Sequence, residues 1–213
     1  MKRLILILML VPLLVACNKK MVFSLFEQDR QNYDLTEWID GEEWVYEDNG
    51  KFWVGVTMNE DDYDGYYKAK MFILNKTDST ILFDPDSVSA RLFNQVKLDP
   101  RGKLEYLEVY TNDELQRRLK KQQNATMFLQ GMATGLSSTD ELPQNTAANY
   151  ALAKMMEDDR RFKEIGYLKK TTLYPYKSIA GYMFLKKDVG EFMLLDIPVG
   201  GDVFSFQWMM QRK

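Results

Sequence analysis

The sequence predicts a mainly β protein, an antiparallel β-sandwich that is interrupted by a helical hairpin. Short segments with alternating apolar residues dominate the chain, and clusters of Asp, Asn, Gly and Pro separate them at intervals of roughly 8 to 12 residues. Between about residues 112 and 168 the apolar spacing becomes helical, and alternation then resumes up to residue 210. Together these three observations predict an α+β chain in which β structure prevails.

Period-2 alternation identifies the individual strands. In residues 52–58 the side chains of Phe52, Val54, Val56 and Met58 fall on one face, as every second side chain of a strand does. The same pattern predicts strands at 67–73, 80–83, 87–93, 104–110, 171–174, 179–185, 191–199 and 202–210. In the last of these, Trp208 alternates with Phe204 and Phe206, so we expect Trp208 in the core.

Two segments between the strands have helical spacing. Residues 112–133 open with Asn112 as an expected N-cap, and residues 145–168 place Ala and Met residues on one face. That face either packs against the rest of the domain or serves as an adaptable partner surface. Because the last strand needs partners from earlier in the chain, residues 41–213 are expected to form one domain, with the helical insertion at about 112–168.

The N-terminus has the composition of a secretory signal. Lys2 and Arg3 precede a thirteen-residue apolar run that ends at Ala16. A membrane-spanning helix needs about 20 apolar residues, so this run is too short to be one. Cys17, the only cysteine, follows directly. We therefore expect residues 1–16 to be a signal peptide and residues 17–40 to be a lipidated tether that joins the body near Trp38.

Residues 14–17, Leu-Val-Ala-Cys, resemble the lipobox of bacterial prolipoproteins of the Bacteroidota type. The resemblance implies that the Cys17 sulfur carries a diacylglycerol, that a peptidase cleaves before Cys17, and that the new amino group is acylated. Two or three acyl chains anchor a protein firmly, whereas one does so only marginally. Asn18 in place of Asp favours the outer membrane, and Lys19 with Lys20 favours its periplasmic face.

The body resembles a group of uncharacterised bacterial lipoproteins with an immunoglobulin-like β-sandwich. The resemblance rests on residues 56–90, where a strand ends at Asn75 and the turn Phe-Asp-Pro-Asp-Ser-Val follows, and on residues 167–185. In the second segment Thr172, Pro175 and Gly181 form a T-x-x-P…G pattern. Tyr176 stands where the group has Gly after the proline, and the group implies a fold but no activity.

Composition excludes several chemistries. The chain has no histidine, and no thiol remains once Cys17 is acylated, so His- and Cys-based zinc sites, catalytic triads and disulfides are excluded. Without residues 1–16 the chain carries 26 basic and 31 acidic residues, a net charge of −5. Residues 21–65 contain thirteen acids against two bases, which argues against nucleic acid as a partner. We expect no cofactor and no catalytic residue.

Two surface patterns are candidate ligand sites. Trp38, Trp44 and Trp53 lie in the acidic first third, where their rings could stack on sugars, although sheet packing also uses aromatic residues. Glu60, Asp62 and Asp64 precede Gly65 as in an EF-hand loop. The twelfth position of that loop is Met71 and not an acid, so a solvated turn is the preferred interpretation and no metal is expected.

Two further patterns concern modification and catalysis. Asp86-Ser87-Val88 and Asp78-Ser79-Thr80 resemble an O-glycosylation signal of exported Bacteroidota proteins, which makes Ser87 and Ser79 candidate sites. A pair of carboxylates could hydrolyse a glycosidic bond, but no pair can be named among 31 acids.

The sequence therefore predicts a non-catalytic lipoprotein of the cell envelope, a binding or scaffolding module anchored through Cys17 at the outer membrane, facing the periplasm. Its expected partners are the membrane and another envelope protein or a glycan. A glycan-binding module and a carboxylate hydrolase are the alternatives.

Overall fold

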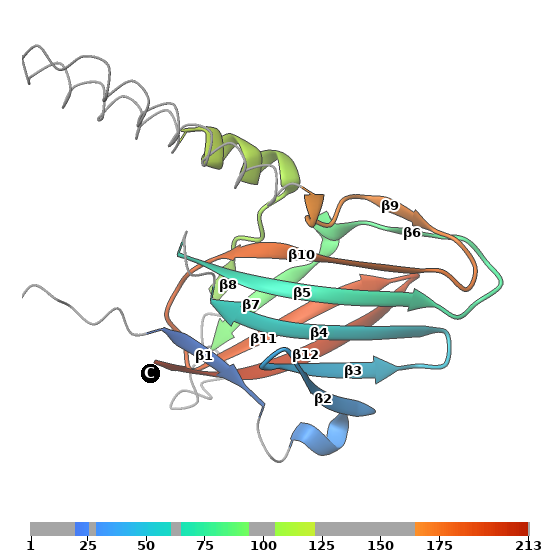
Figure 1. Cartoon of the computed structure of the whole chain (residues 1–213), viewed down its shortest axis with the longest axis horizontal. Helices are drawn as coiled ribbons and strands as arrows, with labels where there is room; N and C mark the ends of the chain where they lie inside the picture. Colours follow the sequence, from blue (N-terminus) through green and yellow to red (C-terminus); the bar gives the residue numbers. More distant parts are fainter. Residues whose placement is uncertain (1–19, 26–28, 61–64, 94–104, 122–164, 213) are drawn as a thin grey trace, which may run out of the picture.

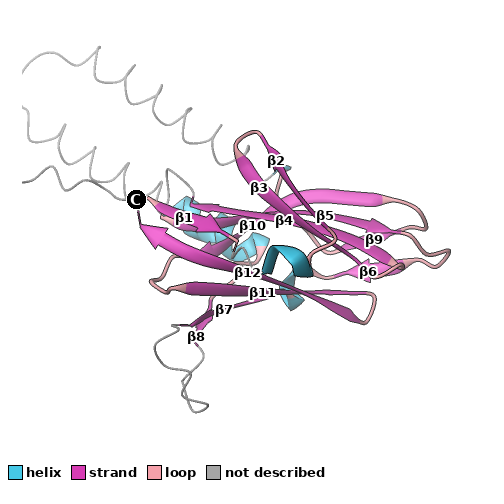
Figure 2. Ribbon diagram, turned by 90° about the horizontal axis from the view of Figure 1, so that it is seen from below, coloured by secondary structure: helices cyan, strands magenta, loops and turns pink. Residues whose placement is uncertain are grey.

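The computed structural model describes residues 20–25, 29–60, 65–93, 105–121 and 165–212. Within these residues the chain forms antiparallel β-sheets arranged in two layers, with a hydrophobic core between them (Figures 1 and 2). This arrangement is consistent with the predicted β-sandwich.

The first sheet has five strands in the order β1 (Met21–Ser24), β12 (Asp202–Arg212), β11 (Phe192–Val199), β7 (Ser89–Phe93) and β8 (Glu105–Leu107). The second sheet has the order β10 (Ser178–Lys186), β5 (Tyr66–Asn75), β4 (Phe52–Glu60), β3 (Glu42–Asp48) and β2 (Leu35–Ile39). A separate two-stranded ribbon joins β6 (Ile81–Phe83) to β9 (Thr171–Leu173). Two 3₁₀ turns, η2 (Asp29–Asn32) and η3 (Pro85–Ser87), and a helix at residues 112–121 complete the described elements.

Alternating side chains from both sheets fill the core. Val54, Val56 and Ile73 of the second sheet are fully buried, and Phe204, Phe206 and Trp208 of the first sheet are buried opposite them. The core position of Trp208 is thus confirmed. Each predicted strand from residue 52 onward overlaps a strand of the structure, because half-buried strands show period-2 alternation clearly.

Residues 17–40, expected to be a tether, contain two strands of the sheets. Met21–Ser24 form β1, which pairs with the C-terminal half of β12, and Leu35–Ile39 form β2 at the edge of the second sheet. Alternation is not visible in either strand, because β1 has four residues and four of the five residues of β2 are exposed. β3, directly after residue 41, was not predicted either.

The two parts of the chain on either side of the insertion share their sheets. β5 pairs with β10, β7 pairs with β11, and β6 pairs with β9, so strands before residue 112 bind strands after residue 168. Of the insertion itself, residues 112–121 are described and helical, and residues 122–164 lie outside the described residues.

The helix at 112–121 begins one residue earlier than expected. The hydroxyl of Thr111 accepts a hydrogen bond from the Glu114 amide at 3.2 Å, and the Glu114 carboxylate accepts one from the Thr111 amide at 3.1 Å. This reciprocal pair is a capping box, so Thr111 and not Asn112 is the N-cap.

Candidate functional site

The outer face of the second sheet carries a row of aromatic side chains. Directly opposite residues on neighbouring strands point to the same side, and the register pairs Tyr46 with Gly55, and Gly55 with Phe72. Trp44 lies two residues before Tyr46, and Trp53 two before Gly55, so both share that side. We call Trp44, Tyr46, Trp53 and Phe72 the aromatic face.

The four rings of the aromatic face contact one another in sequence across three strands. Trp44 and Tyr46 stack with centroids 6.1 Å apart, and Tyr46 and Trp53 are tilted at 5.2 Å. Trp53 meets the edge of Phe72 at 5.5 Å. Trp44, Trp53 and Phe72 are each partly exposed, whereas Tyr46, which lies between the two Trp rings, is only 6% exposed and supports them from below.

Gly55 gives the Tyr46 ring its place against the sheet. A Cβ atom at position 55 would lie 2.3 Å from Tyr46 Cε1, so only glycine leaves room for the ring. The ring covers the backbone of β4 in the way that aromatic side chains cover glycines on a sheet. Burial, followed by a hydrogen bond to Glu37 and the Glu37 charge, raises the pKa of the Tyr46 hydroxyl.

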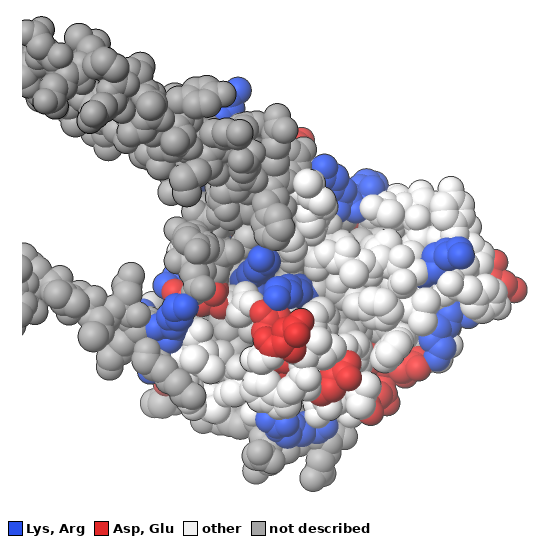
Figure 3. Space-filling model, in the orientation of Figure 1, with Lys and Arg blue, Asp and Glu red and all other residues white. Residues whose placement is uncertain are grey.

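Charged groups lie beside the aromatic face on the same side of the sheet. Lys70 Nζ binds both oxygens of Glu42, at 2.6 and 2.7 Å, and Asn59 donates to Glu42 at 2.6 Å. The ammonium of Lys68 lies 4.3 Å from the centroid of the Tyr182 ring. Figure 3 shows an uncharged area over the right-hand part of β4 and β5, next to a group of basic and acidic side chains over their left-hand part.

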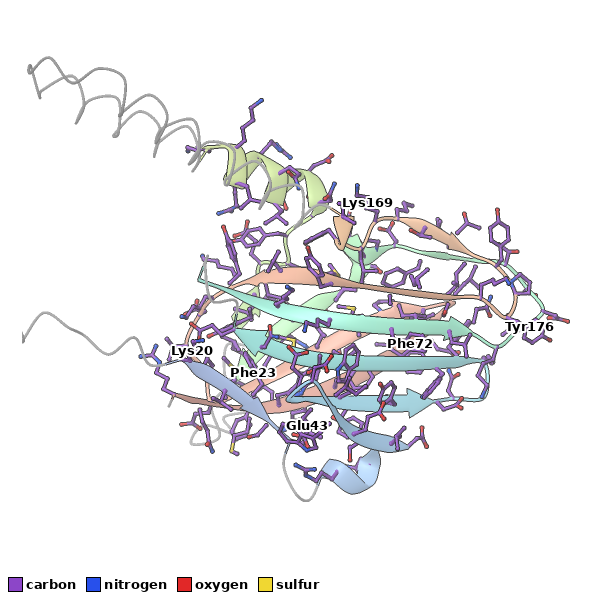
Figure 4. The ribbon with its side chains drawn as sticks, in the orientation of Figure 1. Lys20, Phe23, Glu43, Phe72, Lys169 and Tyr176 are labelled. Carbon is purple, nitrogen blue, oxygen red and sulfur yellow. The ribbon has the colours of Figure 1, made fainter. Side chains whose placement is uncertain are left out.

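The structure brings Trp44 and Trp53 together but not Trp38. Glu37 is paired with Trp44, so Trp38, the next residue, points to the opposite side of β2. Trp38 is 67% exposed, and none of the three lies among the residues of the core between the sheets. The sequence interpretation did not include Phe72, although alternation from Met71 and Ile73 places it on the outer face; Figure 4 shows Phe72 there.

The two candidate glycosylation serines are exposed and lie in turns. The Ser87 hydroxyl, in η3, donates a hydrogen bond to the Asp84 carbonyl at 2.6 Å. The Ser79 hydroxyl contacts the Asp78 carboxylate at 3.4 Å. Both positions are accessible to solvent. Cys17 and the signal residues 1–16 lie outside the described residues.

Glu60 is the described member of the calcium-like loop, since Asp62 and Asp64 lie outside the described residues. Its carboxylate accepts a hydrogen bond from the Met21 amide and forms an ion pair with Lys187. In the part of the chain that the structure describes, no cluster of three or more Asp, Glu, His or Cys residues could hold a metal ion.

Many acids of the described surface have basic partners. The pairs are Glu43 with Arg30, Glu42 with Lys70, Asp48 with Lys76, Asp84 with Lys170, Asp196 with Arg91, Asp202 with Lys51 and Glu108 with Arg118. The hydrogen bond from Lys76 lowers the pKa of Asp48, and that from Lys170 lowers the pKa of Asp84. A general acid needs a raised pKa, so these two carboxylates are unsuited to that role.

Burial, followed by the charge of Asp34, raises the pKa of Glu47.

Comparisons of the chain with protein-family models, with curated proteins and with solved structures found no match. Among the described residues, no helix has the length and hydropathy required to cross a bilayer. The geometry of the site therefore carries the functional argument.

Proposed function

We propose that the chain is a non-catalytic binding module of the bacterial cell envelope, anchored by acyl chains on Cys17 at the periplasmic side of the outer membrane. The Leu-Val-Ala-Cys sequence after a thirteen-residue apolar run supports the anchor. Two antiparallel sheets around one core support an immunoglobulin-like sandwich as the body. Ion pairing of the named acids supports a binding role over a hydrolytic one.

The observation that carries the binding role is the aromatic face. Large aromatic side chains on an outer sheet face leave apolar surface in water, which is costly unless a ligand covers it. Trp and Tyr are also the residues that contribute most to binding at protein surfaces, because they bury much area at a small cost in side-chain entropy. The four rings are in contact in a row from β3 to β5, so a ligand bound to this face would lie across these strands.

A glycan is the ligand class that the surroundings of this face favour. Sugar rings combine an apolar C–H face, which stacks on aromatic rings, with hydroxyl groups that donate hydrogen bonds. Carboxylates are acceptors when ionised, and Glu37 and Glu42 both lie on the same side of the sheet as Trp44. The glycan hypothesis is the second candidate, within the broader proposal of a binding module.

The anchor is tested by fractionation of the native host. We expect the protein in the membrane fraction, with a mature N-terminus at Cys17 that carries fatty acids by mass spectrometry. Cys17→Ser should leave a soluble, unacylated precursor with residues 1–16 attached. Native protein recovered in that same unacylated form would contradict the proposal.

The binding surface is tested with the acyl-free body on an array of envelope polysaccharides. Trp53→Ala should weaken binding at least tenfold, about 1.4 kcal/mol, because it removes the central ring of the row. Trp38→Ala is the matched control, since it removes an exposed Trp from the other side of β2 and should leave affinity unchanged. Equal losses in the two variants would refute the aromatic face as the site, and no binding at all would refute the glycan.

The catalytic alternative is tested with the same polysaccharides. Incubation with the pure body should release no reducing sugar or fragment. Turnover would overturn the non-catalytic part of the proposal.

A further inference from the structure

The distance between the anchor and the folded body is very short. β1 begins at Met21, only four residues after Cys17. A fully extended chain spans at most about 3.6 Å per residue, so Met21 lies within roughly 14 Å of an acylated Cys17. That is less than half the length of β5, which has ten residues and spans roughly 33 Å.

One end of the molecule gathers around Met21. In the first sheet Met21 is paired with Arg212, near the end of the chain. In the second sheet β4 ends at Glu60, whose carboxylate accepts a hydrogen bond from the Met21 amide and pairs with Lys187. We call the residues at this end, together with the β10–β11 loop 187–191, the anchored end. Figure 1 shows β1 and the C-terminus together there, and Figure 4 places Lys20 and Tyr176 at opposite ends.

From this geometry, and given the acylation of Cys17 that the proposed function requires, we propose that the anchored end rests on the lipid headgroup surface. The strands then run away from the bilayer, and the turns at Tyr176 and Asn49 point into the periplasm. The partner of this surface is the headgroup layer of the membrane that holds the anchor.

The β10–β11 loop presents one exposed apolar side chain to the headgroup layer, because Val189 is 63% exposed. Its charges are mixed: Asp188 and Glu191 lie on either side of Val189, Lys187 is paired with Glu60, and Lys186 precedes the loop at the end of β10. An exposed apolar side chain can enter the interface while nearby lysine side chains extend toward the phosphates. Core packing does not explain the position of Val189, because its exposed side chain adds little to the core.

This orientation determines how far the aromatic face lies from the bilayer surface. Trp53 lies seven residues along β4 from Glu60, roughly 23 Å further from the bilayer. A ligand on the aromatic face would therefore meet the protein above the headgroups and alongside an upright sheet. Proteins or polymers that lie in the periplasm could reach it without contacting lipid.

The test uses the full lipidated protein in vesicles of phosphatidylethanolamine and phosphatidylglycerol that carry a nitroxide on the headgroup. Because Cys17 is the only cysteine and its sulfur carries the diacylglycerol in the proposed lipoprotein, an introduced cysteine would be the single thiol available for a fluorophore. Val189→Cys labels the anchored end. Val203→Cys and Ala180→Cys label the far end, on the outer faces of the first and second sheet respectively.

We expect the label at 189 to be quenched several-fold more strongly than the labels at 203 and 180. If the label at 203 is quenched as strongly as the label at 189, the body lies with its first sheet on the membrane. If the label at 180 is quenched as strongly as the label at 189, the body lies with its second sheet on the membrane. Either result overturns the proposed orientation. Equal, weak quenching at all three positions also overturns it. Protein that does not associate with vesicles and reacts with a second fluorophore at Cys17 would instead refute the anchor itself.

Discussion

At the scale of single residues, Asn75 shows how one polar side chain joins distant parts of the chain. It is fully buried at the end of β5. Its amide group donates to the carbonyls of Ser79, Leu173 and Tyr174 at 2.7, 3.2 and 3.3 Å, and its oxygen accepts from Thr77 at 3.0 Å. The turn after β5 is thereby fixed to β9, across the helical insertion.

Asn75→Ala should lower the free energy of unfolding by about 3 kcal/mol, because it removes the hydrogen bonds of a fully buried amide, including the buried one to the Leu173 carbonyl. Urea denaturation of the acyl-free body measures the change. Asp78→Ala, in the same turn but exposed, should change it by less than about 0.5 kcal/mol. Similar values for both variants would show that the Asn75 hydrogen bonds contribute little.

Tyr176 occupies a backbone conformation that glycine prefers. Its φ angle is 56°, it follows Pro175, and the turn is closed by a hydrogen bond from the Lys177 amide to the Tyr174 carbonyl at 3.2 Å. The side chain is 68% exposed, so little burial offsets the strain. Tyr176 therefore adopts the left-handed conformation that this turn requires at the cost of backbone strain.

Tyr176→Gly should raise the free energy of unfolding by about 1 kcal/mol, since the left-handed conformation costs other residues about 1–2 kcal/mol and glycine's larger unfolded-state entropy offsets part of the gain. Tyr176→Ala keeps the strain and should not stabilise. The comparison is made by thermal and urea unfolding. An equal gain in both variants would assign the effect to the tyrosine side chain and not to the backbone.

At the scale of elements, β1 is an integral part of the first sheet. Met21 is 5% exposed, and Leu25, just after the strand, is 4% exposed; Phe23 meets the Tyr67 ring edge-on at 5.1 Å. β1 also covers the edge of β12, which otherwise presents unpaired backbone groups. A strand that is integral to the domain thus begins four residues after Cys17.

Leu25→Ala should lower the free energy of unfolding by about 3 kcal/mol, the usual loss for a buried leucine. Leu82→Ala is the matched control, because Leu82 is 56% exposed, and should cost well under 1 kcal/mol. A body that starts at residue 26 should lose more than the Leu25 variant and should self-associate through β12 in analytical ultracentrifugation. Unchanged stability of that shorter body would show that β1 is dispensable.

The hairpin of β2 and β3 could have been found in the sequence. Asp40 and Gly41 have φ angles of 52° and 79°, both positive as a type I′ turn requires. Asp-Gly is one of the strongest hairpin signals, and it lies between the two strands that alternation did not identify. Because β2 is an exposed edge strand, only the turn, and not the pattern of its side chains, reveals it.

At the scale of the whole molecule, buried tyrosines couple stability to alkaline pH. Burial, followed by the charge of Glu60, raises the pKa of Tyr67 to about 12, and its hydroxyl donates a hydrogen bond to the Asp188 carbonyl. Burial also raises the pKa values of Tyr110 and Tyr167. In the unfolded chain a tyrosine loses its proton near pH ~10.

The folded state therefore holds these protons to a higher pH than the unfolded state does. Their contribution to stability should be complete below pH ~10 and should be lost as the pH rises toward about 12. Urea midpoints measured across this range should fall. Tyr67→Phe should make the decline shallower, and Tyr106→Phe, at a position that is 66% exposed, is the control. A midpoint independent of pH would contradict the coupling.

The sequence by itself determined the β class of the fold and its strands from residue 52 onward. Alternation encodes these because each strand buries one face. It also placed Trp208 in the core and identified Trp44 and Trp53 as candidate ligand-contact residues. Alternation in β5 would have predicted that Phe72 lies on the outer face.

Only the tertiary structure decided which aromatic residues meet. β3 was not recognisable as a strand, so its register with β4, which sets Tyr46 on Gly55 between Trp44 and Trp53, could not be derived. Likewise, a short exposed strand shows no pattern, so Trp38 could not be assigned to the other side of β2. Register depends on hydrogen bonds between segments distant in the chain, and a shift by one residue would reverse the face of every side chain.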